Sequence, residues 1–162
     1  MNIRKLLTRL VSLALIAVFL PTVAMADTWY LEDGSITVSA TDSGQNVSQG
    51  GVTKADSAPV IRNRDSSAST TNNVTIRADT GATANVTLED TNIDTTGGAG
   101  PNGAGDAAVR TEGAGNVNLN VELDNTLQSG STHAGVEKGN GGNLTIGSES
   151  GSGQLVATGG SS

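Results

Sequence analysis

The sequence predicts an all-β protein built as a right-handed parallel β-helix (a solenoid) of about four coils. Two observations lead to this prediction. Short segments with an apolar residue at every second position recur along the chain, and similar segments return at a fixed interval. Val109 and Val136 lie 27 residues apart, and so do Val117 and Leu144. Each coil of a solenoid buries its inward face only against its neighbours, so such repetition is expected of stacked coils.

The first segment of the chain predicts export. Residues 1–9 carry three basic side chains and no acidic one, residues 10–20 are almost wholly apolar, and Ala24-Met25-Ala26 offers small residues to a signal peptidase. Eleven residues rise about 16 Å as a helix, too little for a bilayer core of about 30 Å. We therefore expect a signal peptide over residues 1–26, a mature chain that begins at Asp27, a secreted or cell-surface location, and no membrane insertion after cleavage.

The mature composition narrows the classes of fold and partner. Six basic and 16 acidic side chains give the mature chain a net charge near −10, which repels nucleic acid and anionic lipid. Cysteine is absent, so no disulfide supports the fold. The mature chain holds one Trp and one Tyr, and this scarcity of large side chains favours thin layers of Val, Ile and Leu over a β-sandwich.

The mature chain divides into two parts in this interpretation. Residues 27–33 form an N-terminal capping segment, and residues 34–162 form the repeats. Within residues 34–158 we expect parallel strands, with Gly and Asn at the corners to supply positive φ angles. Alternation puts the apolar side chains on one face of each strand and Thr, Asn or Ser on the other. The side chains expected to point inward include Val74, Ile76, Val86, Leu88, Leu119, Val121, Leu144 and Ile146.

The final segment GQLVATGGSS delivers a strand and a glycine turn without a polar cap. A solenoid without a cap exposes its core and its sheet edges. We therefore expect the sequence to be the N-terminal part of a longer domain.

Several segments carry a family resemblance: LEDTNIDT from residue 88, NVNLNVELDNTLQSGS from residue 116, HAGVEKG from residue 133 and GNLTIGSESGSGQLVATGG from residue 142. Over residues 30–162 the chain resembles the secreted carbohydrate-binding-type β-helix proteins of Gram-positive gut and soil bacteria. This resemblance implies an architecture similar to that of pectate lyases. It also implies binding of plant polysaccharide or acidic sugars, in some members with calcium and usually without cleavage.

Acidic residues gather at two matching corners. Glu89, Asp90 and Asp94 flank one corner, and Glu122 and Asp124 occupy the same corner of the next coil. Stacking brings the two sets within roughly 5 Å of each other. Two alternatives follow from the resulting repulsion: a hard cation such as calcium holds the carboxylates together, or the side chains splay into water. The sequence holds no established calcium-loop motif to decide between them.

Other residues bear on sugar binding and catalysis. Trp29 and Tyr30 either stack on sugar rings or lie over the first coil as a cap. His133 is the single histidine of a cysteine-free chain, which argues against a nucleophilic triad and against zinc. A lyase would need a basic residue beside calcium-holding acids, and Arg77, one of three candidates, is better explained as an ordinary surface pair with Asp79. Those candidates are Arg77, Arg110 and Lys138.

Two functions remain open from the sequence. The first is a monomeric, non-catalytic extracellular module that recognises polysaccharide, cell-surface glycan or acidic sugars, requires no cofactor and uses calcium as an optional aid. The second is a structural β-solenoid stalk or adhesin segment of a bacterial surface protein.

Overall fold

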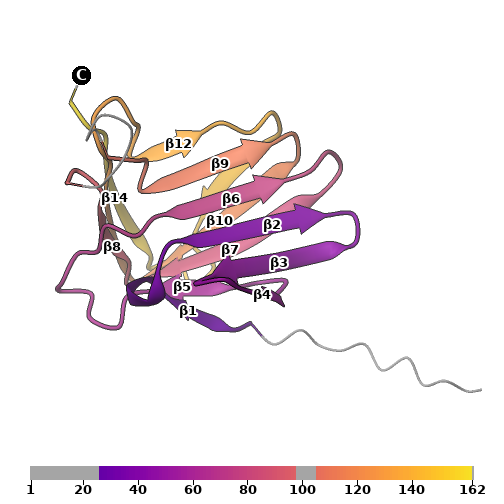
Figure 1. Cartoon of the computed structure of the whole chain (residues 1–162), viewed down its shortest axis with the longest axis horizontal. Helices are drawn as coiled ribbons and strands as arrows, with labels where there is room; N and C mark the ends of the chain where they lie inside the picture. Colours follow the sequence, from indigo (N-terminus) through magenta and orange to yellow (C-terminus); the bar gives the residue numbers. More distant parts are fainter. Residues whose placement is uncertain (1–25, 98–104, 162) are drawn as a thin grey trace, which may run out of the picture.

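A computed structural model describes residues 26–97 and 105–161 of the chain (Figure 1). The predicted signal peptide, apart from Ala26, lies outside the described residues. The described part is all-β, and the single helical turn within it is the short 3₁₀ segment Leu31–Asp33. None of the described residues form a helix long and apolar enough to cross a membrane.

The strands form three sheets. Sheet 1 holds, in spatial order, β1 (Thr28–Tyr30), β5 (Val60–Arg62), β7 (Thr83–Glu89), β10 (Asn116–Glu122) and β13 (Leu144–Gly147). Sheet 2 holds β12 (Val136–Lys138), β9 (Val109–Gly113), β6 (Val74–Ala78), β2 (Ile36–Thr41), β3 (Gly44–Gln49) and β4 (Val52–Ala55). Sheet 3 holds β14 (Gln154–Thr158), β11 (Asp124–Gln128) and β8 (Asn92–Asp94).

From β7 onward the chain visits sheet 1, sheet 3 and sheet 2 in turn, and each returning strand pairs in parallel with its predecessor. The 27-residue interval is confirmed as a register: Val136 pairs with Val109, and Leu144 pairs with Val117. Asp90 and Leu123, with φ angles of 52° and 57°, make the corner between sheets 1 and 3. Corners of positive φ are therefore present, although Asp and Leu supply these two.

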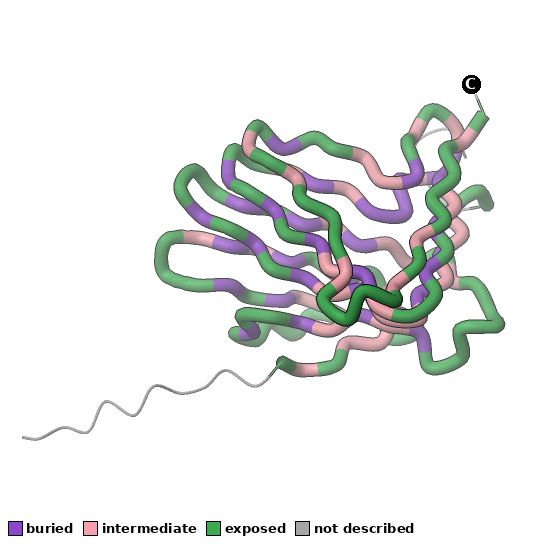
Figure 2. Tube along the Cα trace, turned by 180° about the vertical axis from the view of Figure 1, so that it is seen from behind, coloured by how far each residue is buried: buried purple, intermediate pink, exposed green. Residues whose placement is uncertain are grey.

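The inward face is largely as the alternation predicts, and buried positions alternate with exposed ones along the strands (Figure 2). Six of the eight predicted inward side chains are buried. Leu144 is partly buried, and the prediction for Ile146 is wrong, because this side chain is 44% exposed. β13 is the last strand of its sheet, so no described strand covers the side of Ile146 that faces away from Leu119.

The expectation that residues 34–158 contain parallel strands alone is wrong for residues 44–55. β2 pairs with β3, and β3 with β4, in antiparallel register. Gly50 and Gly51 both take positive φ angles, 56° and 82°, the combination that a two-residue hairpin turn requires. The chain thus reverses twice before it reaches β5.

The stack of sheets has two different ends. At the end that we call the closed end, the β3–β4 hairpin extends sheet 2 while β1 and the 3₁₀ turn lie beside it, with Leu31 and Val47 fully buried. At the end that we call the open end, β12, β13 and β14 are the terminal strands of their sheets. Sheet 1 connects the two ends, and its outer face carries most of the polar side chains considered next.

Candidate functional site

The two aromatic residues of the mature chain face opposite ways. Trp29 pairs in register with Ile61, packs partly buried against the core, and donates a hydrogen bond from Nε1 to Asp56 Oδ2 at 2.9 Å. Tyr30 points outward, and the Arg64 guanidinium lies 4.4 Å from the centroid of its ring. Trp29 thus lies on the terminal strand of sheet 1 with its side chain against the core, and the role of the two residues in sugar stacking stays a prediction.

The two acidic corners stack as expected, with Glu122 and Glu89 paired in register. A basic residue that the sequence analysis missed completes the row. Arg62 places NH1 2.5 Å from Glu89 Oε1 and NH2 3.7 Å from Asp90 Oδ2. Arg62 lies one 27-residue interval before Glu89, so the repeat could have identified Arg62 as a neighbour of Glu89. This ion pair offsets the repulsion that the stacked carboxylates would otherwise create.

Glu122 is held by the turn that connects β13 with β14. Its carboxylate accepts hydrogen bonds from the Ser150 hydroxyl, from the Ser150 backbone N–H at 3.1 Å, and from the Glu149 backbone N–H at 2.7 Å. The Ser150 hydroxyl, followed by the Ser150 backbone N–H, lowers the pKa of Glu122 to about 2. We call this arrangement the Glu122 latch.

The remaining acids of the predicted calcium site stand apart. Asp94 accepts hydrogen bonds from the Thr96 hydroxyl and backbone N–H at 2.6 and 3.0 Å, which lower its pKa, and Asp124 is exposed on β11. Across residues 26–97 and 105–161, no group of three or more His, Cys, Asp or Glu residues could hold a metal ion. Calcium takes six to eight oxygen ligands, whereas Glu89 and Asp90 already face a guanidinium, and Asp94 and Glu122 face N–H and O–H donors. The residues as placed do not fit a calcium ion.

The residues considered for catalysis sit in ordinary ion pairs and hydrogen bonds. His133 Nδ1 lies 2.5 Å from Glu137 Oε2, and Glu137 Oε1 lies 3.0 Å from Arg110 Nε. Arg77 NH2 pairs with Glu112 Oε2 at 2.5 Å. Lys138 Nζ donates to the backbone carbonyl of Asn140 at 2.8 Å. Each of the three candidate bases, and His133, therefore already has a polar partner within the protein.

The outer face of sheet 1 carries a regular set of amide and hydroxyl side chains. Asn85, Asn118 and Thr145 share one rung of the register, and Thr87, Asn120 and Gly147 share the next. Asn118 Nδ2 donates to Asn85 Oδ1 at 2.9 Å, so the neighbouring strands β7 and β10 are joined within one rung. We call Asn85, Thr87, Asn118, Asn120 and Thr145 the amide ladder.

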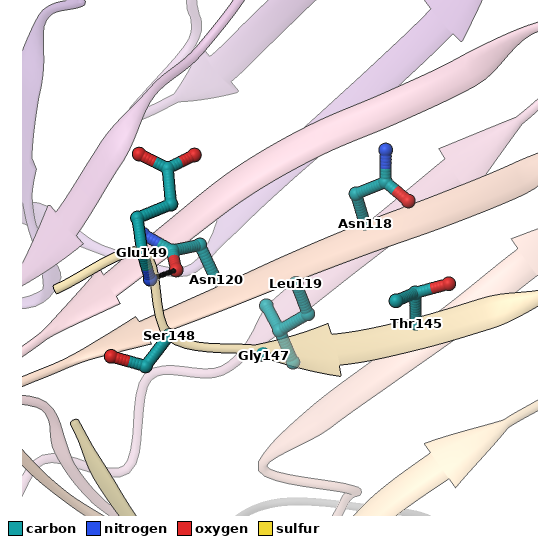
Figure 3. Close-up of a pocket in the computed structure, with 7 residues that line it drawn as sticks. All are labelled: Asn118, Leu119, Asn120, Thr145, Gly147, Ser148 and Glu149. Carbon is teal, nitrogen blue, oxygen red and sulfur yellow. Dashed lines mark hydrogen bonds between the residues drawn. The ribbon is translucent and has the colours of Figure 1, made fainter. Parts of the chain in front are cut away.

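A pocket of about 160 Å³ opens at one end of the amide ladder (Figure 3). Gly147 leaves an open space there, because no side chain fills the position after Thr145 on this face. Asn120 Oδ1 accepts a hydrogen bond from the Glu149 backbone N–H at 2.8 Å, which fixes the rim. The pocket is lined by Asn118, Leu119, Asn120, Thr145, Gly147, Ser148 and Glu149. Sequence alternation marked the outward Asn residues but gave no sign that a pocket would form.

A second pocket, of about 370 Å³, lies among Tyr30, Arg62, Asn63 and Arg64. Its two arginines would suit an anionic ligand if they were free. Arg62 is paired with Glu89, and Arg64 makes a two-point contact with Asp33 at 2.9 and 2.7 Å. The carboxylates match or outnumber the guanidinium groups here, so the site has little attraction for an acidic sugar.

Comparisons with protein-family models, with curated proteins and with solved structures found no match for this chain. The resemblance to secreted carbohydrate-binding β-helix proteins therefore stays a prediction from the sequence.

Proposed function

We propose that this chain is an exported, monomeric parallel β-helix module that binds a neutral polysaccharide without cleaving it. The observation that carries the proposal is the amide ladder with the pocket at its end. Asn amides both donate and accept, the Thr hydroxyls do the same, and Glu149 adds a carboxylate acceptor on the rim. These are the groups that recognise the hydroxyls of a sugar.

The right-handed β-helix with about four coils is part of this proposal. The repeated order of sheets and the parallel, in-register pairing support it. In such a coil stack, equivalent side chains recur at the strand spacing of about 4.8 Å. A row of equivalent sites at a regular spacing suits a polymer of repeating units better than it suits a single small molecule.

Charge selects the neutral class of polysaccharide. The mature chain carries a net charge near −10, and the two arginines beside Tyr30 are already paired with carboxylates. An anionic polymer would meet repulsion over most of the surface. The five residues of the amide ladder are uncharged, and Glu89 and Glu122 follow them at the ends of β7 and β10.

The test is a binding comparison between neutral and acidic polysaccharides by affinity electrophoresis of the secreted protein. We expect retardation in at least one neutral polysaccharide and none in the acidic ones. The double variant Asn118→Ala/Asn120→Ala should bind about 30-fold more weakly, since the loss of two hydrogen-bonding side chains costs about 1 kcal/mol each. The matched control Thr37→Ala/Thr53→Ala changes exposed residues of sheet 2 and should bind as the wild type does. Equal losses in both variants would contradict the proposal.

The second candidate is the stalk or adhesin segment, favoured by the open end. Three terminal strands there offer edges on which further β-structure could stack. A protein that binds no polysaccharide in the test above, while remaining folded, would favour this second function.

A further inference from the structure

Asp56 is a buried carboxylate at the closed end. Asp56 is 1% exposed, and its carboxylate accepts three hydrogen bonds from nitrogen donors. Oδ2 accepts from the Asp27 backbone nitrogen at 3.1 Å and from Trp29 Nε1 at 2.9 Å. Oδ1 accepts from the Ala58 backbone nitrogen at 3.2 Å. All three donors are uncharged in the unprocessed chain.

A buried carboxylate is costly unless a cation or several strong donors compensate it. Within the described part of the chain, Asp56 takes part in no ion pair. Lys54 approaches this region, but its Nζ is directed to Asp27 Oδ2 at 2.6 Å. Among the described residues, the charge of Asp56 therefore has no direct cationic partner.

The residue whose nitrogen meets Asp56 is the one that the sequence marks as the first of the mature protein. Signal peptidase would hydrolyse the Ala26–Asp27 peptide bond. Water supplies the hydroxyl of a new carboxyl group on Ala26 and a hydrogen to the nitrogen of Asp27. An α-amino group has an ordinary pKa near 8, so at neutral pH the nitrogen takes up a further proton and becomes an ammonium.

We propose that Asp56 is the binding site for the α-ammonium group that signal cleavage creates at Asp27. The inference rests on the export proposed above, and it adds a role for the cleavage itself. Processing converts a neutral N–H donor into a cation in contact with a buried carboxylate, and thereby locks the closed end. Before cleavage the same nitrogen offers a hydrogen bond but no charge.

The surroundings of Asp27 are already arranged for this contact. The Asp27 carbonyl accepts a hydrogen bond from the Val60 backbone nitrogen at 3.0 Å, and its carboxylate pairs with Lys54. Gln45 Nε2 donates to the Asp56 carbonyl at 3.0 Å and so fixes the backbone of the receptor. Ala26 is exposed, so its removal uncovers the nitrogen without removing packing from the core.

The experiment compares four secreted proteins by thermal unfolding at neutral pH. The first two are the wild type and a form with Gly-Ser inserted after Ala26, which keeps the amide hydrogen bond but moves the ammonium away. The other two carry Asp56→Asn in each of these backgrounds. Mass spectrometry first establishes where each chain begins. If natural cleavage occurs elsewhere, the predicted cleavage site is wrong. The Asp56 proposal is then tested on a chain produced to begin at Asp27.

We expect the Gly-Ser extension to lower the melting temperature of the wild type by about 5 °C, and to change that of Asp56→Asn by less than about 1 °C. An equal drop in both backgrounds would show a steric cost of the extension and would overturn the proposal. No drop in the wild type would overturn it as well.

A second measurement covers the case in which Asp56→Asn does not fold. In the native wild type, the α-amine should react with an acetylating reagent about tenfold more slowly than the α-amine of the Gly-Ser form, because a paired ammonium yields less free amine. Lys138 serves as the internal reference in both proteins. Equal reaction rates of the two α-amines would refute the contact.

Discussion

Rows of inward apolar side chains on sheet 1 are covered at the closed end and left exposed at the open end. On sheet 1 the inward row of Val121, Leu88 and Ile61 ends at Trp29, which packs on the core and is bonded to Asp56. The inward row of Val86 and Leu119 ends at Ile146, which is 44% exposed. Alternation therefore says which way a side chain points, whereas burial depends on whether another strand or a cap lies beyond it.

The largest expected effect comes from cutting back the core at the closed end. Leu31→Ala should lower the free energy of unfolding by about 2–5 kcal/mol, because it leaves a cavity at a fully buried position. Ile146→Ala at the open end should cost less than about 1 kcal/mol, since its side chain loses little contact. Urea denaturation of both variants measures the difference. Similar costs would mean that the two ends are equally covered in solution.

A smaller effect is expected on association through strand edges. β14 carries no charged residue and exposes Val156 at 58%, whereas β4, the terminal strand of sheet 2 at the closed end, carries Lys54. Val156→Lys should therefore reduce aggregation on heating, as charges on edge strands do. Light scattering during a thermal ramp measures this aggregation. Val52→Lys is the control, and a stronger benefit from that control would reverse the comparison of the two edges.

A local effect is expected from the Glu122 latch. The folded pKa of about 2 lies below the ordinary value of 4.5, so the carboxylate stabilises the folded state above pH 4.5. That contribution declines as the pH falls from about 4.5 and is gone below about 2. Glu122→Gln should remove this part of the pH dependence of stability and speed amide exchange at Glu149 and Ser150. Glu149→Gln keeps the backbone donors and should leave the exchange at Ser150 unchanged, and the opposite pattern would rule out the latch.

The smallest expected effect is that of calcium. Because Arg62 and the turn at Ser150 already occupy the acidic corners, calcium should change the melting temperature no more than a neutral salt at equal ionic strength. A stabilisation that saturates with calcium and disappears in Asp90→Asn/Asp124→Asn would restore the calcium site.

Much of the fold could be predicted from the alternation and the interval. The pairs Val109 with Val136 and Val117 with Leu144 follow directly from the 27-residue spacing, because a parallel stack converts a repeat into a register. The hairpins of residues 44–55 were missed, because this segment has few apolar residues to mark a strand and the direction of pairing is set at the turns Asp42-Ser43 and Gly50-Gly51. Local turn geometry, not hydrophobicity, decides the direction of pairing there.

The candidate sites could be predicted less well. The stacking of Glu89 on Glu122 follows from the repeat, but the neutralising Arg62 and the Glu122 latch depend on contacts between coils. The burial of Asp56 had no signal in the sequence, because its donors come from three separate positions. Contacts of this kind are fixed by the path of the loops, which composition does not determine.

The register of sheet 2 has a consequence for how such a chain changes over evolutionary time. Along one row, Ile36 pairs with Val74, Val74 with Val109, and Val109 with Val136, across intervals of 38, 35 and 27 residues. The rungs stay aligned although the intervals differ, because the excess length lies outside the paired rows, in the β3–β4 hairpin and in the connections between sheets. Insertions and deletions in those connections can therefore accumulate without shifting a single rung, and each coil can acquire its own loop while the ladder beneath it is inherited unchanged.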